Sequence, residues 1–242
     1  MKTPNKTLLI ITLLIFALAG PASSQTQFMG WAATFQNYKV TDKFGLYFDA
    51  QWRSTAQVRQ AHALLLRPGI NFYFSPSFTG AVGYAFIPQQ RISAGVTGYL
   101  PEHRVWEQLV FTHKVKTPAG HSATATVTHR LRLEQRYLPK HHAEGNELVK
   151  DGHRYAGRVR YFARGVLPLA AQKDKGPFAA LQNEIFFHTA DGGSFDQNRA
   201  YVAAGYRMSR QFDVEMGYMN QYVAGSSPVN NHILQVATYI RL

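Results

Sequence analysis

Hydrophobic and polar residues alternate along most of this chain with a period of two. In residues 127–137, for example, Leu131 and Leu133 fall on one face and Arg132 and Glu134 on the other. Successive side chains of a β-strand point to opposite faces, so this pattern predicts strands. The alternation is most regular in residues 44–53, 64–74, 127–137, 212–219 and 234–242.

Six further segments have the composition of strands but alternate less regularly, which brings the count to eleven. They are residues 29–38, 78–87, 104–114, 154–166, 178–188 and 198–208. Short turns, such as residues 75–77 and 209–210, alternate with long polar connections rich in Gly, Pro or Asn. This alternation is typical of an up-and-down antiparallel barrel. The long connections are expected at residues 88–103, 138–153, 189–197 and 223–230.

Most of these segments are ten residues or longer, whereas strands of soluble sheets average about 5 to 6. A strand needs about 9 to 11 residues to cross a bilayer. We therefore expect an all-β, up-and-down antiparallel transmembrane β-barrel with its apolar face outward. Single-chain bacterial barrels have even strand numbers, so we predict ten or twelve strands rather than eleven. A soluble, lipocalin-like periplasmic binding barrel is the alternative.

The amino terminus indicates export. Lys2 and Lys6 precede an apolar run, residues 8–19, which small residues follow up to Ser24. This is the composition of a cleaved secretory signal peptide, and the run is shorter than the ~20 residues of a spanning helix. We predict a signal peptide at residues 1–24 and an outer-membrane β-barrel at residues 25–242, in a Gram-negative bacterium.

The chain has no cysteine, which excludes disulfides and thiolate chemistry, and its formal net charge is +12. If the apolar face is outside, the polar face lines the lumen. Ten arginines fall on that face: Arg53, Arg67, Arg130, Arg132, Arg136, Arg158, Arg160, Arg164, Arg199 and Arg207. Five acids join them: Asp49, Glu134, Glu184, Asp213 and Glu215.

Guanidinium groups inside a small barrel need carboxylates, carbonyls or water as partners. One interpretation is a structural plug in which Glu134, Glu184 and Glu215 each bridge several arginines. The other uses the surplus positive charge for an anion-binding or anion-selective lumen. The candidate site residues in this charge network are Arg130, Arg132, Glu134, Arg136, Arg158, Arg160, Glu184, Arg199 and Glu215.

Several sequence blocks resemble one known family. The blocks are residues 129–136 (HRLRLEQR), 183–184 with Phe186, 195–199 (FDQNR), 217–221 (GYMNQ), 67–70 (RPGI), 83–84 and 104–108 (RVWEQ). Together they are similar to domain-of-unknown-function family 2490. The family is found mainly in Bacteroidetes, and the resemblance implies that this chain forms an outer-membrane barrel. It implies no activity, cofactor or catalytic residue.

Other chemistry has weak support in the sequence. His129 lies on the apolar face without a neighbouring outward Ser, so a lipid-modifying enzyme of the outer membrane is only an alternative. His141, His142 and His153 lack a carboxylate at metal-ligand spacing, and residues 191–194 lack the repeated acids of a calcium loop. No phosphate-binding loop or dinucleotide fingerprint is present. We therefore expect no catalytic residue, no metal site and no cofactor.

The sequence thus predicts a structural or small-solute pore protein with an Arg/Glu-lined lumen. The more specific form of this hypothesis adds a preference for anions. Its expected partners are outer-membrane lipid, lipopolysaccharide and the barrel-insertion machinery. Nucleic acid is not expected, because the basic residues alternate along strands instead of forming an exposed arm. The sequence leaves the oligomeric state open.

Overall fold

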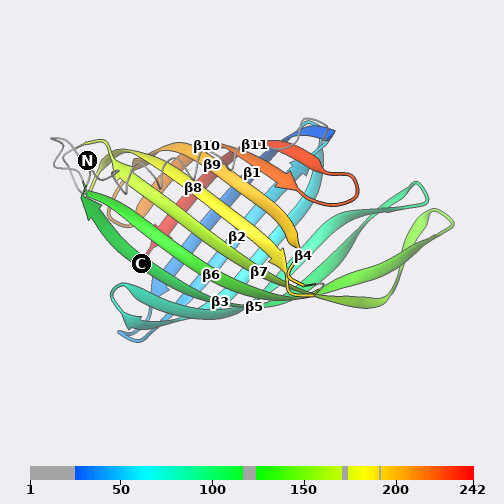
Figure 1. Cartoon of the computed structure of the whole chain (residues 1–242), viewed down its shortest axis with the longest axis horizontal. Coiled ribbons are helices and arrows are strands. Elements are labelled where there is room, and N and C mark those ends of the chain that lie inside the picture. Colours follow the sequence, from blue (N-terminus) through cyan, green and yellow to red (C-terminus); the bar gives the residue numbers. More distant parts are fainter. Residues whose placement is uncertain (1–24, 117–123, 171–173, 191) are drawn as a thin grey trace, which may run out of the picture.

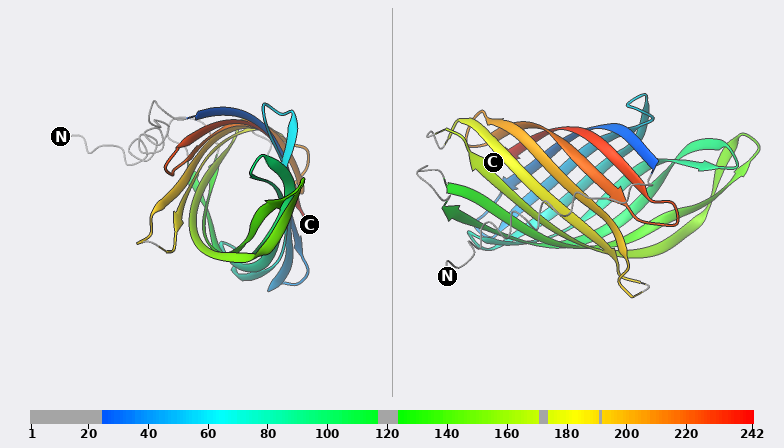
Figure 2. Two further views of the ribbon diagram at one scale, coloured as in Figure 1. Left: turned by 90° about the vertical axis from the view of Figure 1, so that its right-hand side faces the viewer. Right: turned by 45° about the horizontal axis from the view of Figure 1, so that its top comes forward.

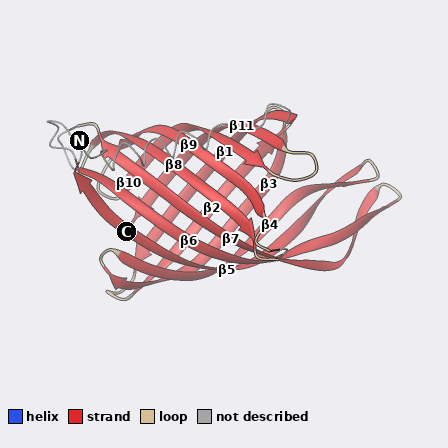
Figure 3. Ribbon diagram, viewed as in Figure 1, coloured by secondary structure: helices blue, strands red, loops and turns tan. Residues whose placement is uncertain are grey.

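A computed structural model describes residues 25–116, 124–170, 174–190 and 192–242 of the chain. The expected signal peptide, residues 1–24, lies outside the described residues. The described part is all-β (Figures 1 and 3) and contains no helix long and apolar enough to cross a membrane. Its strands are β1 (Gln25–Lys39), β2 (Phe44–Thr55), β3 (Gln60–Ser75), β4 (Phe78–Ser93), β5 (Val96–Lys116), β6 (Thr124–Glu144), β7 (Glu147–Pro168), β8 (Gly176–His188), β9 (Phe195–Arg207), β10 (Phe212–Val223) and β11 (Val229–Arg241).

The strands form one closed barrel, seen end-on in the left panel of Figure 2. Each strand pairs antiparallel with the next along the chain, as expected for an up-and-down topology. The prediction of ten or twelve strands is wrong, since the described residues form eleven. With an odd number, the first and last strands run in the same direction. They close the barrel as a parallel pair, from Gln25 opposite Val229 to Asn37 opposite Arg241.

Two of the expected long loops are also wrong. Residues 88–103 and 138–153 belong almost entirely to the hairpins β4–β5 and β6–β7, which project beyond the rest of the barrel on the right of Figure 1. Their Pro and Gly residues suggested loops. Pro88 pairs with Pro101 near the point where β4 loses contact with β3, and an edge strand tolerates proline. Turns at residues 94–95 and 145–146 close the two hairpins.

The expected orientation of the two faces is confirmed. On β6, Leu131 is 45% exposed on the outside, while the next residue, Arg132, is 1% exposed inside the barrel. On β10, Met216 is outside and Glu215 is buried inside. The interior is more apolar than the sequence suggested, because it holds two buried clusters among the charges. One contains Met29, Trp31, Phe178, Ala180, Tyr201, Ala203, Met219 and Ile233. The other contains Tyr47, Ala63, Leu65, Ala85, Ile87 and Trp106.

Candidate functional site: the charged lumen

The charged network of the lumen follows from strand alternation and register. Arg132 and Glu134 point inward from β6, and they lie opposite Arg160 and Arg158 on β7. Positions two residues apart share a face, so each strand supplies a ladder of polar groups to the same interior. Neighbouring ladders are therefore within reach of one another.

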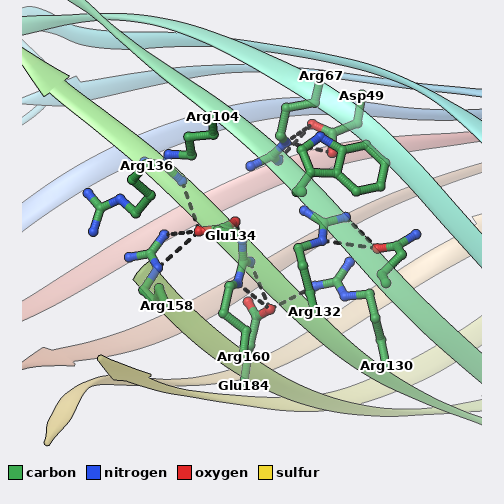
Figure 4. A network of polar contacts seen from close by, with 12 residues as sticks. Asp49, Arg67, Arg104, Arg130, Arg132, Glu134, Arg136, Arg158, Arg160 and Glu184 are labelled. Atoms are coloured by element: carbon green, nitrogen blue, oxygen red, sulfur yellow. Dashed lines mark hydrogen bonds and ion pairs between the residues drawn. The ribbon is translucent and has the colours of Figure 1, made fainter. Parts of the chain in front are cut away.

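Glu134 is the centre of this network (Figure 4). Its carboxylate accepts hydrogen bonds from Arg158 Nη2 at 2.7 Å, from Arg104 Nη1 at 3.3 Å and from Arg160 Nη1. These arginines come from β7 and β5, the two strands beside β6. The prediction that Glu134 bridges several arginines is confirmed. A carboxylate with three cationic donors has its charge fully compensated despite its burial.

Glu184 on β8 extends the network along the barrel wall. Its Oε1 atom lies 2.7 Å from Arg130 Nη2 and 2.8 Å from Arg160 Nη2. Arg160 therefore joins Glu184 to Glu134 through opposite edges of one guanidinium group. The planar guanidinium donates in a fixed fork, which suits this bridging position.

A third buried carboxylate, Glu102 on β5, was not predicted. It lies 2.6 Å from Arg104 Nε, 2.7 Å from Arg136 Nε and 3.7 Å from Arg91 Nη2. It was missed because residues 88–103 were interpreted as a loop. The alternation of residues 102, 104, 106 and 108 was the signal that could have identified it. Asp196, the second residue of β9, pairs with Arg158 at 3.1 Å and was missed for a similar reason, because residues 189–197 were expected to form a loop.

Two further carboxylates form ion pairs apart from this network. Asp49 on β2 accepts from Arg67 Nη2 at 2.7 Å and from the Tyr47 hydroxyl at 2.7 Å. Near the opposite rim from the long hairpins, Asp213 lies 3.1 Å from Arg207 and 2.8 Å from Arg241. Both carboxylates were expected in the lumen.

Glu215 departs from the prediction that it bridges several arginines. Among the described residues it pairs with one arginine, Arg164, at 2.5 Å. Its other partners are the hydroxyl groups of Tyr239 at 2.8 Å and Tyr201 at 3.1 Å. The reason is local: its register partners on β9 and β11 are Gly205 and Ala237, and the tyrosines that reach it stand further along the same inward faces.

Three buried or half-buried arginines have no carboxylate within ion-pair distance in the described part of the chain: Arg53, Arg132 and Arg199. Aromatic rings and amides hold them instead. Arg53 and Arg199 lie 3.8 and 5.2 Å from the Trp31 ring centroid, and Arg132 lies 4.6 Å from that of Trp106. Such cation–π contacts strengthen when they are desolvated. The inward aromatic residues were not part of the predicted network.

The side chains divide the lumen into two cavities of about 480 and 340 Å³. Five side chains line both cavities and form the layer between them: Trp31, Arg53, Arg67, Arg160 and Arg199. We call the larger one the first cavity and the smaller one the second cavity. Asp49 and Glu184 line the first cavity. The described residues that line the second include seven arginines and no carboxylate.

The other candidate residues lie outside the lumen. His129 Nδ1 is 2.8 Å from the Tyr161 hydroxyl, and its Nε2 is 3.2 Å from His113 Nε2. His142 pairs with Asp151, and the ring of His153 contacts that of His103. In the described ranges, no three His, Cys, Asp or Glu side chains gather as a metal site would require. Asp191, the first residue of the weak calcium motif, lies outside the described residues.

Comparison with known proteins identifies the family and nothing beyond it. No curated protein and no solved structure matches the chain. One family model matches residues 28–232, which include most of the barrel and all of the network around Glu134. The chain therefore belongs to the family described as a protein of unknown function, DUF2490.

Proposed function

We propose that this protein is a transmembrane barrel of the Gram-negative outer membrane whose lumen is plugged by its own side chains. It acts as a structural barrel that passes no bulk solution. The observation that carries the proposal is the set of contacts that reach across the lumen. Arg164 on β7 pairs with Glu215 on β10, Arg199 on β9 contacts Trp31 on β1, and the Tyr47 ring packs on that of Trp106.

The outer surface supports the membrane location. Strands of 12 to 22 residues exceed the length needed to cross a bilayer. Large apolar side chains such as Ile70, Val202 and Met216 are more than half exposed around the wall. A soluble protein rarely exposes so continuous an apolar surface. Lipid, lipopolysaccharide and the barrel-insertion machinery are the partners that this location requires.

Polar residues on the outer wall find partners on the adjacent strand. Asn183 and Asn198 exchange side-chain hydrogen bonds between β8 and β9, and Asn220 donates to Asn230 between β10 and β11. Unpaired polar groups are costly in hydrocarbon, so this pairing is what a lipid-facing wall needs. It supports the membrane location independently of the apolar residues.

Two measurements test the proposal. Cell fractionation with a heat-modifiability gel should recover the chain in the outer membrane as a compact, heat-sensitive band. Recovery in the soluble periplasm without detergent would overturn the membrane location and favour the soluble binding barrel. In planar bilayers the purified chain should show no steady conductance, whereas open porin-like channels would overturn the plug.

A variant of the dividing layer makes the conductance test sharper. Trp31→Ala removes the ring that two arginines share, so it should produce measurable, flickering conductance. Trp52→Ala is the matched control, because Trp52 lies on the neighbouring strand with its ring outside. Equal conductance of the two variants would show that the inner ring does not seal the lumen.

A further inference from the structure

The second cavity differs from every other part of the lumen in its charge. It lies toward the end of the barrel that carries the long hairpins, and Arg53, Arg67, Arg104, Arg136, Arg158, Arg160 and Arg199 line it. Amide side chains and His62 make up much of its remaining polar wall. A cavity lined by seven guanidinium groups and no carboxylate presents cationic donors to any solute inside it.

The carboxylates of the network do not occupy every arginine donor at the second cavity. Glu102 and Glu134 are essentially inaccessible, and they contact the guanidinium groups from outside the cavity. Arg136, for example, donates to Glu102 through Nε and Nη2, which leaves Nη1 without a partner among the described residues. Arg53 and Arg199 have no carboxylate partner among the described residues. The other five arginines pair with carboxylates that do not line the cavity, so Arg53 and Arg199 leave an excess of positive charge at its wall.

Two buried donors in the same wall also lack an acceptor. Trp31 is 7% exposed, and neither its Nε1 atom nor Arg53 Nε has a hydrogen-bond partner in the described structure. A buried N–H group without an acceptor is rare, because it forfeits its hydrogen bonds with water. Both donors belong to the dividing layer, so their residues line the second cavity as well as the first. A ligand with several hydrogen-bond acceptors would satisfy them.

We propose that the second cavity binds a small phosphorylated solute, with its phosphate group against Arg53 and Arg199. A phosphate carries nearly two negative charges and oxygens that match guanidinium donors in bidentate geometry. The volume of about 340 Å³ exceeds what a phosphate group alone requires, so an organic phosphomonoester fits. Amide side chains in the same wall, such as that of Asn231, suit the hydroxyl groups of the esterified part.

This inference deepens the proposed function, since it places a binding site inside the plugged lumen. Isothermal titration of the full, detergent-solubilised chain with glycerol 3-phosphate tests it at low salt. We expect a Kd below about 1 mM, which corresponds to −4.1 kcal/mol. Glycerol should not bind, and sulfate should bind at least tenfold more weakly. Absence of binding by folded protein, or equal binding of sulfate, would overturn the phosphate assignment.

Variants locate the site. Arg199→Gln and Arg53→Gln should each weaken binding tenfold or more, because neither arginine is held by a carboxylate. Arg132→Gln is the matched control, since Arg132 also lacks a carboxylate but lines only the first cavity. It should change the Kd less than twofold. The heat-modifiability gel identifies folded variants. A glutamine variant that fails it is replaced by the lysine variant at the same position, Arg53→Lys or Arg199→Lys. Unchanged binding in both cavity variants, or an equal loss in Arg132→Gln, would refute the location.

The two proposals fail separately. Conductance of the unmodified chain would refute the plug and leave the binding titration intact, because the titration is done on solubilised protein. Lack of phosphate binding by a barrel that is folded and sealed would refute only the binding site.

Discussion

The guanidinium group of Arg164 on β7 lies 2.5 Å from the carboxylate of Glu215 on β10, although β8 and β9 separate these strands along the wall. The pair therefore spans a chord of the barrel instead of linking neighbours. Both side chains are buried, so the interaction is screened little by solvent. Such a pair fixes the lumen dimension at that level.

We expect Glu215→Gln to lower the free energy of unfolding by about 3 to 5 kcal/mol, because it leaves Arg164 buried without a counter-charge. Urea unfolding in detergent measures it. A double-mutant cycle with Arg164→Gln should give a coupling energy of about 0.5 to 3 kcal/mol. Additive effects of the two substitutions would mean that the pair contributes nothing as a unit.

Glu134→Gln should lower the free energy of unfolding by at least as much, again about 3 to 5 kcal/mol, because three arginines lose their shared partner. The same unfolding measurement applies. Glu107→Gln is the control, because Glu107 is on the same barrel level, exposed on the outer wall and bonded to Gln135. An unchanged melting temperature for Glu134→Gln would mean that water, not protein, compensates those arginines.

Gly83→Ala should destabilise the barrel by about 1 to 3 kcal/mol through overpacking. A Cβ atom at this position would overlap both the Trp106 ring and the carbonyl oxygen of Pro68. Gly165→Ala is the control, because a Cβ atom there meets nothing within 4 Å. Thermal unfolding compares the two variants, and similar melting temperatures would contradict the close packing of the Trp106 ring against Gly83.

The parallel closure can be tested with cysteines, since the chain has none of its own. Ala33 and Ala237 are register partners on β1 and β11, so Ala33→Cys with Ala237→Cys should form a disulfide under mild oxidation. Ala33→Cys with Ile233→Cys should not, because four residues of strand separate the positions by about 13 Å. A gel under non-reducing conditions distinguishes these outcomes, and crosslinking of the second pair alone would disprove the register.

Much of the fold could be predicted because alternation reports directly on the two faces of a strand. Each of the eleven segments identified from the pattern is a strand in the structure, and Leu131 and Arg132 occupy the expected faces. The pattern itself contained eleven segments. The strand number was predicted wrongly because known single-chain barrels have even numbers of strands, which led us to expect ten or twelve. The parallel β1–β11 pair is a long-range contact that no local signal encodes.

The site was predictable only where charges alternate along regular strands. Glu134 and its arginines were identified in this way, whereas Glu102 was hidden in a segment with the prolines of a loop. Trp31 and Trp106 form cation–π contacts with arginines that have no carboxylate partner among the described residues, and these contacts depend on which rings meet which guanidinium groups across the interior. Those contacts arise from barrel closure, so they are a property of the assembled structure.

The shared direction of the first and last strands gives the molecule an intrinsic polarity. Gln25 and Leu242 emerge at opposite rims, with Gln25 at the rim that carries the projecting hairpins. In the membrane-spanning arrangement that we propose, reporters attached at these two positions would lie on opposite sides of the membrane. For such a barrel, the direction of insertion would determine which rim faces the cell exterior.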